Sequence, residues 1–174
     1  MIIVINQKHA RGKKLKGATA YIGRAHAEFG YRQSPLANQW SHLNSSRAQH
    51  HVGNIEDAIN CYHRWLLEEV KNELSSAFLE LERLAKLAEQ GDLYLICWCL
   101  GPGDDGTASH GKCHGFVVKR AIEWRIRERK KASQPPPTNT NPEASGNSGN
   151  AHSVPITLLV AAASQAQRPP GIRN

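Results

Sequence analysis

The pattern of hydrophobic positions changes period along the first 131 residues, and these changes predict three strands. Residues 2–6 (IIVIN) form a short apolar run rich in β-branched side chains, which is typical of a buried strand. Residues 18–23 (ATAYIG) predict a second strand that ends at a glycine. Residues 92–100 (DLYLICWCL) are almost wholly apolar, as expected of a strand that is covered on both faces.

Helical periodicity begins after residue 54 and returns twice. Asn54 is a good N-cap, and Glu56 and Asp57 follow it in the first turn, where the helix dipole favours negative charge. A second helix is predicted from about residue 76 to Gly91, and a third from residue 113 to residue 131. The first helix has a broad apolar stripe formed by Ile55, Ala58, Ile59, Tyr62, Trp65, Leu66 and Val70.

This order of elements predicts the fold class. Strands, then helices, then a buried strand that leads into a last helix indicate an α/β fold with a small, largely parallel sheet flanked by helices. The predicted domain covers residues 1–131. Within it, residues 7–17 are interpreted as a basic loop, and residues 24–53 as a long irregular segment of a kind that is often functional. In such folds ligands bind beyond the C-terminal ends of the strands, beside helix N-termini.

Composition changes abruptly after the predicted domain. Residues 132–174 are rich in Pro, Asn and Ser and predict a disordered C-terminal tail with a short apolar segment. No apolar run approaches the roughly 20 residues that a membrane helix needs, so no membrane association is expected. The N-terminus lacks a signal-peptide pattern, and four cysteines do not suggest a disulfide scaffold. We therefore predict a cytoplasmic protein with reduced thiols.

The net charge of +7 is unevenly distributed. Residues 1–50 hold eight Lys or Arg and one acidic residue, residues 51–100 hold four and nine, and residues 101–131 hold eight and four. This layout is consistent with an anionic partner, and solvated surface charge is the alternative. A nucleic acid would contact the basic loop through Lys8, Arg11, Lys13, Lys14 and Lys16.

Three of the four cysteines lie in one stretch with two histidines. Because alternate residues of a strand share a face, Cys97 and Cys99 are expected to point the same way. If the following loop returns Cys113 and His114, or His110 instead of His114, to the same edge, the set suits tetrahedral zinc. The alternative for the first two cysteines is that they are small apolar core residues.

The predicted start of the last helix also suggests an anion site. A helix N-terminus carries partial positive charge, lowers the pKa of a thiol and attracts anions, so Cys113 is a candidate nucleophile or part of a phosphate cradle. His114 is a candidate general acid or base. Arg24 follows a predicted strand, where its guanidinium could clamp a phosphate, with a surface ion pair as the alternative. Asn38 could cap a turn or bind a ligand amide.

The motifs of the chain, in their order, resemble the domain of unknown function 4326 family over residues 2–126. They are IGR at 22–24, SPLAN at 34–38, IEDAINCYHRWL at 55–66, CWC at 97–99 and CHG at 113–115. The resemblance implies an α/β fold but no reaction. By position it carries the family's motif residues onto Gly23, Arg24, Pro35, Leu36, Asn38, Cys97, Cys99, Cys113 and His114, of which Gly23 joins the predicted ligand site.

Together these patterns predict a domain that binds a small anionic ligand, phosphorylated or nucleotide-like, between Gly23, Arg24, Asn38 and the Cys113–His114 helix start. Whether the ligand is turned over is left open, and no cofactor is favoured. One alternative is a nucleic-acid-binding module that uses the basic loop and the basic end of the last helix, at 125–131. The other is a structural zinc domain that uses Cys97, Cys99, Cys113 and His114.

Overall fold

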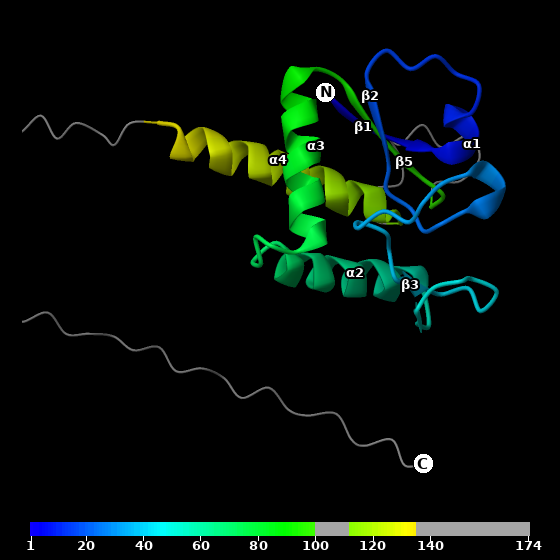
Figure 1. Ribbon diagram of the computed structural model, residues 1–174. Coiled ribbons are helices and arrows are strands. Elements are labelled where there is room, and N and C mark those ends of the chain that lie inside the picture. Colours follow the sequence, from blue (N-terminus) through cyan, green and yellow to red (C-terminus); the bar gives the residue numbers. More distant parts are fainter. Residues whose placement is uncertain (100–111, 135–174) are drawn as a thin grey trace, which may run out of the picture. The chain divides into compact units, whose positions relative to one another are not determined.

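A computed structural model describes residues 1–99 and 112–134 of the chain. Its main sheet contains β1 (Ile2–Asn6), β2 (Ala18–Tyr21) and β5 (Leu93–Cys97) in the order β1-β5-β2. Both pairings are parallel, as Figure 1 shows, so all three strands end at the same edge. A second, smaller sheet pairs β3 (Trp40–Ser41) with β4 (His50–His51), also in parallel. The predicted α/β fold with a small, parallel sheet is confirmed.

Three helices flank the sheet, and each begins at a capping side chain. The Asn54 side chain accepts a hydrogen bond from the Asp57 amide before α2 (Ile55–Glu69), as predicted. Ser75 caps α3 (Ser76–Gln90), and Cys113 caps α4 (His114–Ala132). In Figure 1, α3 and α4 cross beside the sheet, and α4 contacts β1 and β5.

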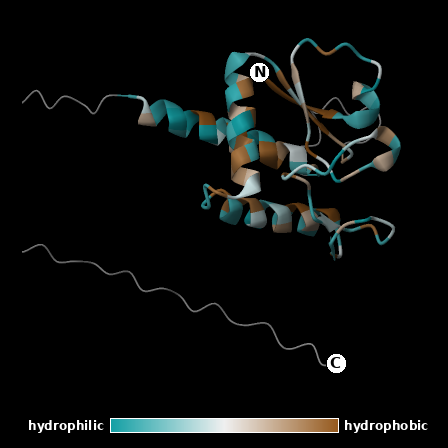
Figure 2. Ribbon diagram, in the orientation of Figure 1, coloured by the Kyte–Doolittle hydropathy of each residue, from teal (hydrophilic) through white to brown (hydrophobic). Residues whose placement is uncertain are grey.

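The core lies where the central strand meets the helices. Leu93 and Leu95 on β5 are fully buried, and so are Val118 and Ile122 on α4. Figure 2 shows hydrophobic residues along the strands, while the helices combine a hydrophobic side with a hydrophilic one. The strands are therefore held by apolar burial, and the helices supply one face each.

The far end of α4 is held against α3 by charged side chains. Arg125 forms an ion pair with Glu82, and its guanidinium lies over the ring of Phe78 at 4.9 Å from the ring centroid. Arg129 pairs with Glu89 at 2.7 Å. Part of the basic segment at 125–131 is thus already neutralised within the domain.

Local structure departs from the predicted pattern at three places. The basic loop begins with a short helix, α1 (Gln7–Ala10), because the Asn6 side chain accepts a hydrogen bond from the Lys8 amide. The irregular segment contains a short 3-10 helix (Ala27–Phe29) besides β3 and β4. The central strand ends at Cys97, so Trp98 and Cys99 lie beyond it and do not alternate on a strand.

No helix within residues 1–99 and 112–134 is long and apolar enough to cross a membrane. The helix α4 extends one residue past the predicted domain end at 131. The predicted disordered tail lies, beyond residue 134, outside the described residues. So do His110 and most of the loop between Cys99 and Cys113.

Candidate functional site

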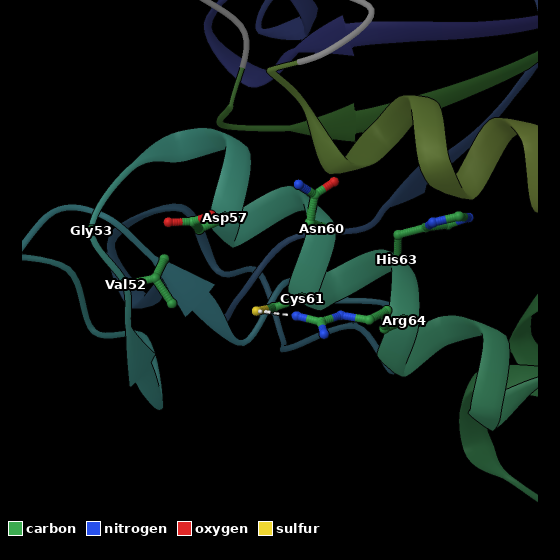
Figure 3. Close-up of a pocket in the computed structure, with 7 residues that line it drawn as sticks. All are labelled: Val52, Gly53, Asp57, Asn60, Cys61, His63 and Arg64. Atoms are coloured by element: carbon green, nitrogen blue, oxygen red, sulfur yellow. Dashed lines mark hydrogen bonds between the residues drawn. The ribbon is translucent and has the colours of Figure 1, made fainter. Parts of the chain in front are cut away.

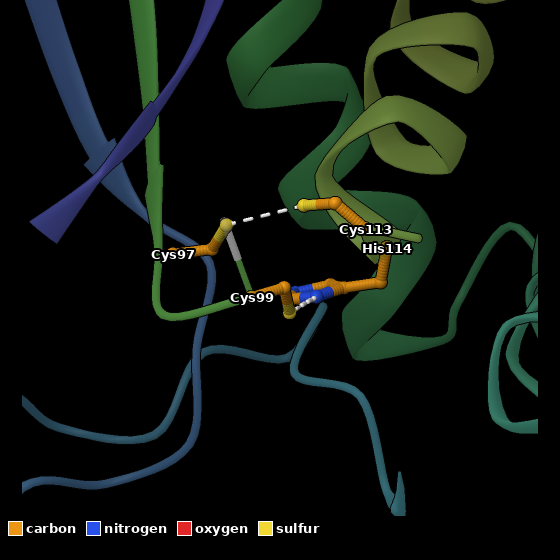
Figure 4. Close-up of side chains that lie close together, drawn as sticks. All are labelled: Cys97, Cys99, Cys113 and His114. Atoms are coloured by element: carbon orange, nitrogen blue, oxygen red, sulfur yellow. Dashed lines mark hydrogen bonds between the residues drawn. The ribbon is translucent and has the colours of Figure 1, made fainter. Parts of the chain in front are cut away.

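Four side chains meet at the edge where the main sheet ends, and we call them the Cys/His cluster. Cys97 is the last residue of β5, Cys99 follows it, and Cys113 and His114 stand at the start of α4. Their four ligand atoms all lie within 4.8 Å of one another, and Figure 4 shows the side chains converging. The sulfurs of Cys97 and Cys113 are 3.3 Å apart, and the sulfur of Cys99 is 2.8 Å from Nδ1 of His114.

The helix start brings Cys113 and His114 to this edge because α4 approaches β1 closely. A Cβ atom at Gly115 would lie 2.6 Å from Cγ1 of Val4, so only glycine fits at this position without a shift. The Gly115 amide donates a hydrogen bond to Sγ of Cys113 at 3.3 Å, which caps the helix. The CHG motif therefore combines two potential metal ligands, Cys113 and His114, with the glycine that lets them approach the sheet.

The ring of His114 is held from both sides. Its Nε2 lies 2.9 Å from the carbonyl oxygen of Ile22. Because a carbonyl oxygen can only accept, Nε2 carries a proton and donates it to Ile22, while Nδ1 faces the sulfur of Cys99. The ring of Tyr62 packs edge-on against His114, with ring centroids 5.3 Å apart.

The electrostatics of the three thiols differ. Contacts with Cys97 and Cys99, together with burial, raise the pKa of Cys113 above its ordinary value. For Cys97, the contact with Cys113 lowers the pKa, but the contact with Cys99 and burial outweigh it and raise the pKa to about 11. Hydrogen bonds from Cys113 and Cys97 hold the pKa of Cys99 well below its usual range. The thiol with the lowered pKa is therefore Cys99, the one that faces Nδ1 of His114.

This arrangement bears on the predicted cofactor. Cys97 and Cys113 are fully buried, His114 is 2% exposed, and Cys99 is exposed. Three thiols and one imidazole at this spacing could hold a metal ion, which fits the zinc alternative better than the absence of a cofactor. The predicted catalytic role of Cys113 stays a prediction, but full burial and a raised pKa do not favour a nucleophile.

A cavity of about 810 Å³ lies beside the cluster, and we call it the strand-end cavity. The residues that follow β2 and β5 line it, together with the first turn of α2 and the start of α4. It therefore occupies the place where parallel α/β sheets bind ligands. Of the predicted site residues it includes Gly23, Arg24, Asn38 and His114, but not Cys113.

Buried polar atoms in the wall of this cavity lack partners. Among the described residues, four buried side-chain polar atoms have no hydrogen bond, and all four residues line the strand-end cavity: Arg24 (Nη1), His26 (Nδ1), Ser46 (Oγ) and Trp98 (Nε1). Arg24 also has no ion-pair partner within the described residues. Because buried polar groups are normally satisfied by protein or water, this concentration makes the cavity the candidate ligand site among the described residues.

Two predicted residues shape the cavity through the backbone. Oδ1 of Asn38 accepts a hydrogen bond from the Trp40 amide at 2.9 Å, so this side chain caps a turn. A Cβ atom at Gly23 would lie 2.5 Å from the Tyr21 hydroxyl, which donates a hydrogen bond to the carbonyl of Arg24 at 2.6 Å. The glycine thus allows the Tyr21 ring to fold back over the turn that presents Arg24.

Sequence reasoning missed the aromatic and additional cationic residues of the cavity. Trp40 and Trp98 line it, and the ring of His26 stacks on Trp98 at a centroid distance of 4.9 Å. Arg47 and Lys112 add positive charge. Most of these residues come from the irregular segment 24–53, which has no periodicity. The tryptophan at position 40, next to the SPLAN motif, was the one signal available.

A second hollow, of about 620 Å³, lies on α2 and is shown in Figure 3. Cys61 and Arg64 line it, and Nη2 of Arg64 lies 3.5 Å from the Cys61 sulfur. The fourth cysteine of the chain is therefore separate from the Cys/His cluster.

Comparison with known proteins gives one match. The family model described as Domain of unknown function (DUF4326) matches residues 5–124, which agrees with the resemblance seen in the motifs. No curated protein and no solved structure shows a significant match to the chain.

Proposed function

The chain belongs to the DUF4326 family of domains of unknown function, and we propose that it binds a small phosphorylated, nucleotide-like ligand in the strand-end cavity. The observation that carries the proposal is the set of four unsatisfied polar groups, all in residues that line this one cavity. A ligand that satisfied them would recover the cost of their burial, which is about 1–3 kcal/mol for each group.

The charge of the cavity supports an anionic ligand. Arg24, Arg47 and Lys112 line it, and Glu28 is the single carboxylate among its described lining residues. A guanidinium with a free, buried nitrogen is the donor that best matches a phosphate or carboxylate. Arg24 lies three residues beyond the end of β2. Helix α4 begins at the same edge of the sheet, and its first residue also lines the cavity.

The aromatic side chains support a ring in the ligand. The rings of Trp40 and Trp98 both lie in the wall of the cavity. Trp40 already stacks on His50 at 5.3 Å between centroids, and Trp98 on His26. A nucleobase offers a flat π-face for such surfaces, and the volume of about 810 Å³ lies in the range of small-molecule sites.

Turnover of this ligand is a further step of the proposal, and His114 is its candidate acid or base. His114 lines the cavity, whereas Cys113 is fully buried and does not line it. The proposal includes a cytoplasmic location, which the four unpaired cysteines favour.

The test is binding of a panel of nucleoside mono-, di- and triphosphates, with inorganic phosphate alongside, measured by calorimetry on the full chain. Arg24→Ala is expected to weaken the tightest ligand by about 10- to 100-fold, because a hydrogen bond to a charged group is lost. Arg64→Ala is the matched control, since that arginine lies on α2 in the separate hollow shown in Figure 3. The proposal is wrong if no nucleotide binds, or if the two arginine variants bind equally.

A nucleic-acid-binding module is the alternative that the basic loop supports. The exposed loop carries Arg11, Lys13 and Lys14, and the helix end at 125–131 is partly neutralised by Glu82 and Glu89. Oligonucleotide binding that falls steeply with salt and is abolished by Lys13→Glu with Lys14→Glu would support this alternative. Nucleotide binding that depends on Arg24 and survives this double charge reversal would support the cavity.

A further inference from the structure

We propose that Cys97, Cys99, Cys113 and His114 bind a structural Zn²⁺ ion in tetrahedral geometry, whether or not the strand-end cavity holds a ligand. Zinc–sulfur bonds of about 2.3 Å in a tetrahedron place the sulfurs about 3.8 Å apart. The four ligand atoms already lie within 4.8 Å of one another. The contacts of 3.3 Å between Cys97 and Cys113 and of 2.8 Å between Cys99 and His114 need only a small expansion around the ion.

The donor set selects the type of metal. Three sulfurs and one imidazole nitrogen are soft or borderline ligands, whereas Mg²⁺ and Ca²⁺ require oxygen. Four protein ligands fill a tetrahedron and leave no position for water or substrate. Such a closed site stabilises the fold and takes no direct part in chemistry, so the zinc is structural. With zinc bound, His114 is a ligand and cannot also act as the acid or base of a turnover step.

His114 is already arranged as a ligand. The Ile22 carbonyl accepts from Nε2–H and thereby fixes the tautomer and the ring plane. Nδ1 faces the cluster beside the sulfur of Cys99, and in the zinc complex its lone pair would bind the ion. The Gly115 amide gives the Cys113 sulfur a similar second partner. These outer contacts are the kind that orient metal ligands in established sites.

The position of the cluster explains what the ion would do. Cys97 ends the central strand, and Cys113 begins α4, so the metal would close the long connection between these two elements. Closing a loop of this length favours the folded state because the unfolded chain loses freedom. Cys99 and His114 also line the strand-end cavity, and zinc would hold that part of its wall.

A disulfide between Cys97 and Cys113 is the competing explanation for their short distance. A disulfide would account for two of the four residues and would not explain the short contact between Cys99 and His114. All four cysteines are free in the structure. The convergence of all four ligands therefore favours the metal.

The experiment begins with the full chain purified under reducing conditions without chelator. Elemental analysis is expected to give one zinc per chain. A thiol reagent is expected to react with Cys61 alone until a chelator is added, after which all four thiols react. Replacement of zinc by Co²⁺ is expected to give the intense visible absorption of a tetrahedral thiolate site.

The variant that tests ligation is Cys99→Ser, because Cys99 is exposed and its substitution opens no cavity in the core. We expect it to lose more zinc affinity than the roughly 10- to 100-fold that removal of an outer-shell partner costs. Cys61→Ser is the matched control and is expected to keep full zinc content, since Cys61 lies outside the cluster.

Three results would overturn the proposal: a metal-free chain that takes up neither Zn²⁺ nor Co²⁺, a native disulfide between Cys97 and Cys113, or equal zinc affinity in Cys99→Ser and Cys61→Ser. Each is read from metal content, cobalt absorption or thiol count. None requires nucleotide binding, so failure of this site and failure of the strand-end cavity are distinguishable.

Discussion

The hydroxyl of Tyr62 donates a hydrogen bond to the carbonyl oxygen of Leu36 at 2.8 Å, and both residues are fully buried. This bond connects α2 to the segment that carries Asn38. It holds one wall of the strand-end cavity in place although Tyr62 itself does not line it.

Removal of that hydroxyl in Tyr62→Phe should therefore destabilise the domain. The Leu36 carbonyl would remain buried without a donor, which costs about 1–3 kcal/mol in free energy of unfolding. Urea denaturation measures the change. Tyr94→Phe is the control, because the Tyr94 hydroxyl has no hydrogen bond within the described residues and its loss should cost little. Equal stability of the two variants would contradict this account.

Tyr62 should also make the domain sensitive to alkaline pH. Burial, followed by the nearby thiols of Cys99 and Cys113, raises the pKa of Tyr62 well above 10.0. In the unfolded chain the same group ionises near pH 10, so the folded state binds more protons above that pH. Its contribution to stability is complete below about pH 10 and is lost as the pH rises towards the folded pKa.

The measurement is tyrosinate absorbance and helical circular dichroism followed together from pH 8 to pH 12. We expect the absorbance that is missing in Tyr62→Phe to appear only with the loss of the helical signal. If all four tyrosines ionise while the circular dichroism stays native, Tyr62 is not buried in the way that the structure shows.

Gly115→Ala should loosen the start of α4. The added methyl would overlap Cγ1 of Val4 on β1, and overpacking of this kind costs about 1–3 kcal/mol. The melting temperature and the zinc content should both fall, because Cys113 and His114 move with the start of the helix. Gly91→Ala is the matched control, since it has open space and an extended backbone with φ 168°. A wild-type melting temperature for Gly115→Ala would show that the contact is not tight.

The contact between α3 and α4 predicts a stronger effect at Arg125 than at Lys131. Arg125→Ala loses a partly buried ion pair with Glu82 and the stacking on Phe78, together about 1–2 kcal/mol. Lys131 pairs with Glu128 in solvent, so Lys131→Ala should cost less than about 0.5 kcal/mol. Denaturation in low and high salt measures both, and the reverse ranking would contradict the packing of the two helices.

Regular elements were predictable because local chemistry determines them. The run at 2–6 and the cap at Asn54 specify a strand and a helix without distant partners. The end of β5 was not predictable from the sequence. The CWC motif alternates as a strand does, yet strand pairing stops with Cys97 opposite Asn6. Beyond Asn6 the chain that forms β1 continues into α1, so Cys99 has no strand to pair with.

The candidate site was predictable where motifs concentrate it. Gly23, Arg24, Asn38 and His114 were placed together by the rule that parallel strands end at one edge. The burial of Cys113 was not predictable, because the start of a helix can face either solvent or the core. Here Gly115 lets the start of α4 pack against Val4. The aromatic wall depends on tertiary contacts of an aperiodic segment, which no local pattern encodes.

The strand order β1-β5-β2 also governs when the domain can form during synthesis. Ile2 and Ala18 both lie opposite Leu93, so the first two strands leave the ribosome long before their shared neighbour exists. A nascent chain shorter than about 93 residues therefore cannot form the main sheet, and its first two apolar strands have no pairing partner. We therefore expect folding efficiency to depend on how well these two strands are kept from aggregating until β5 has been made.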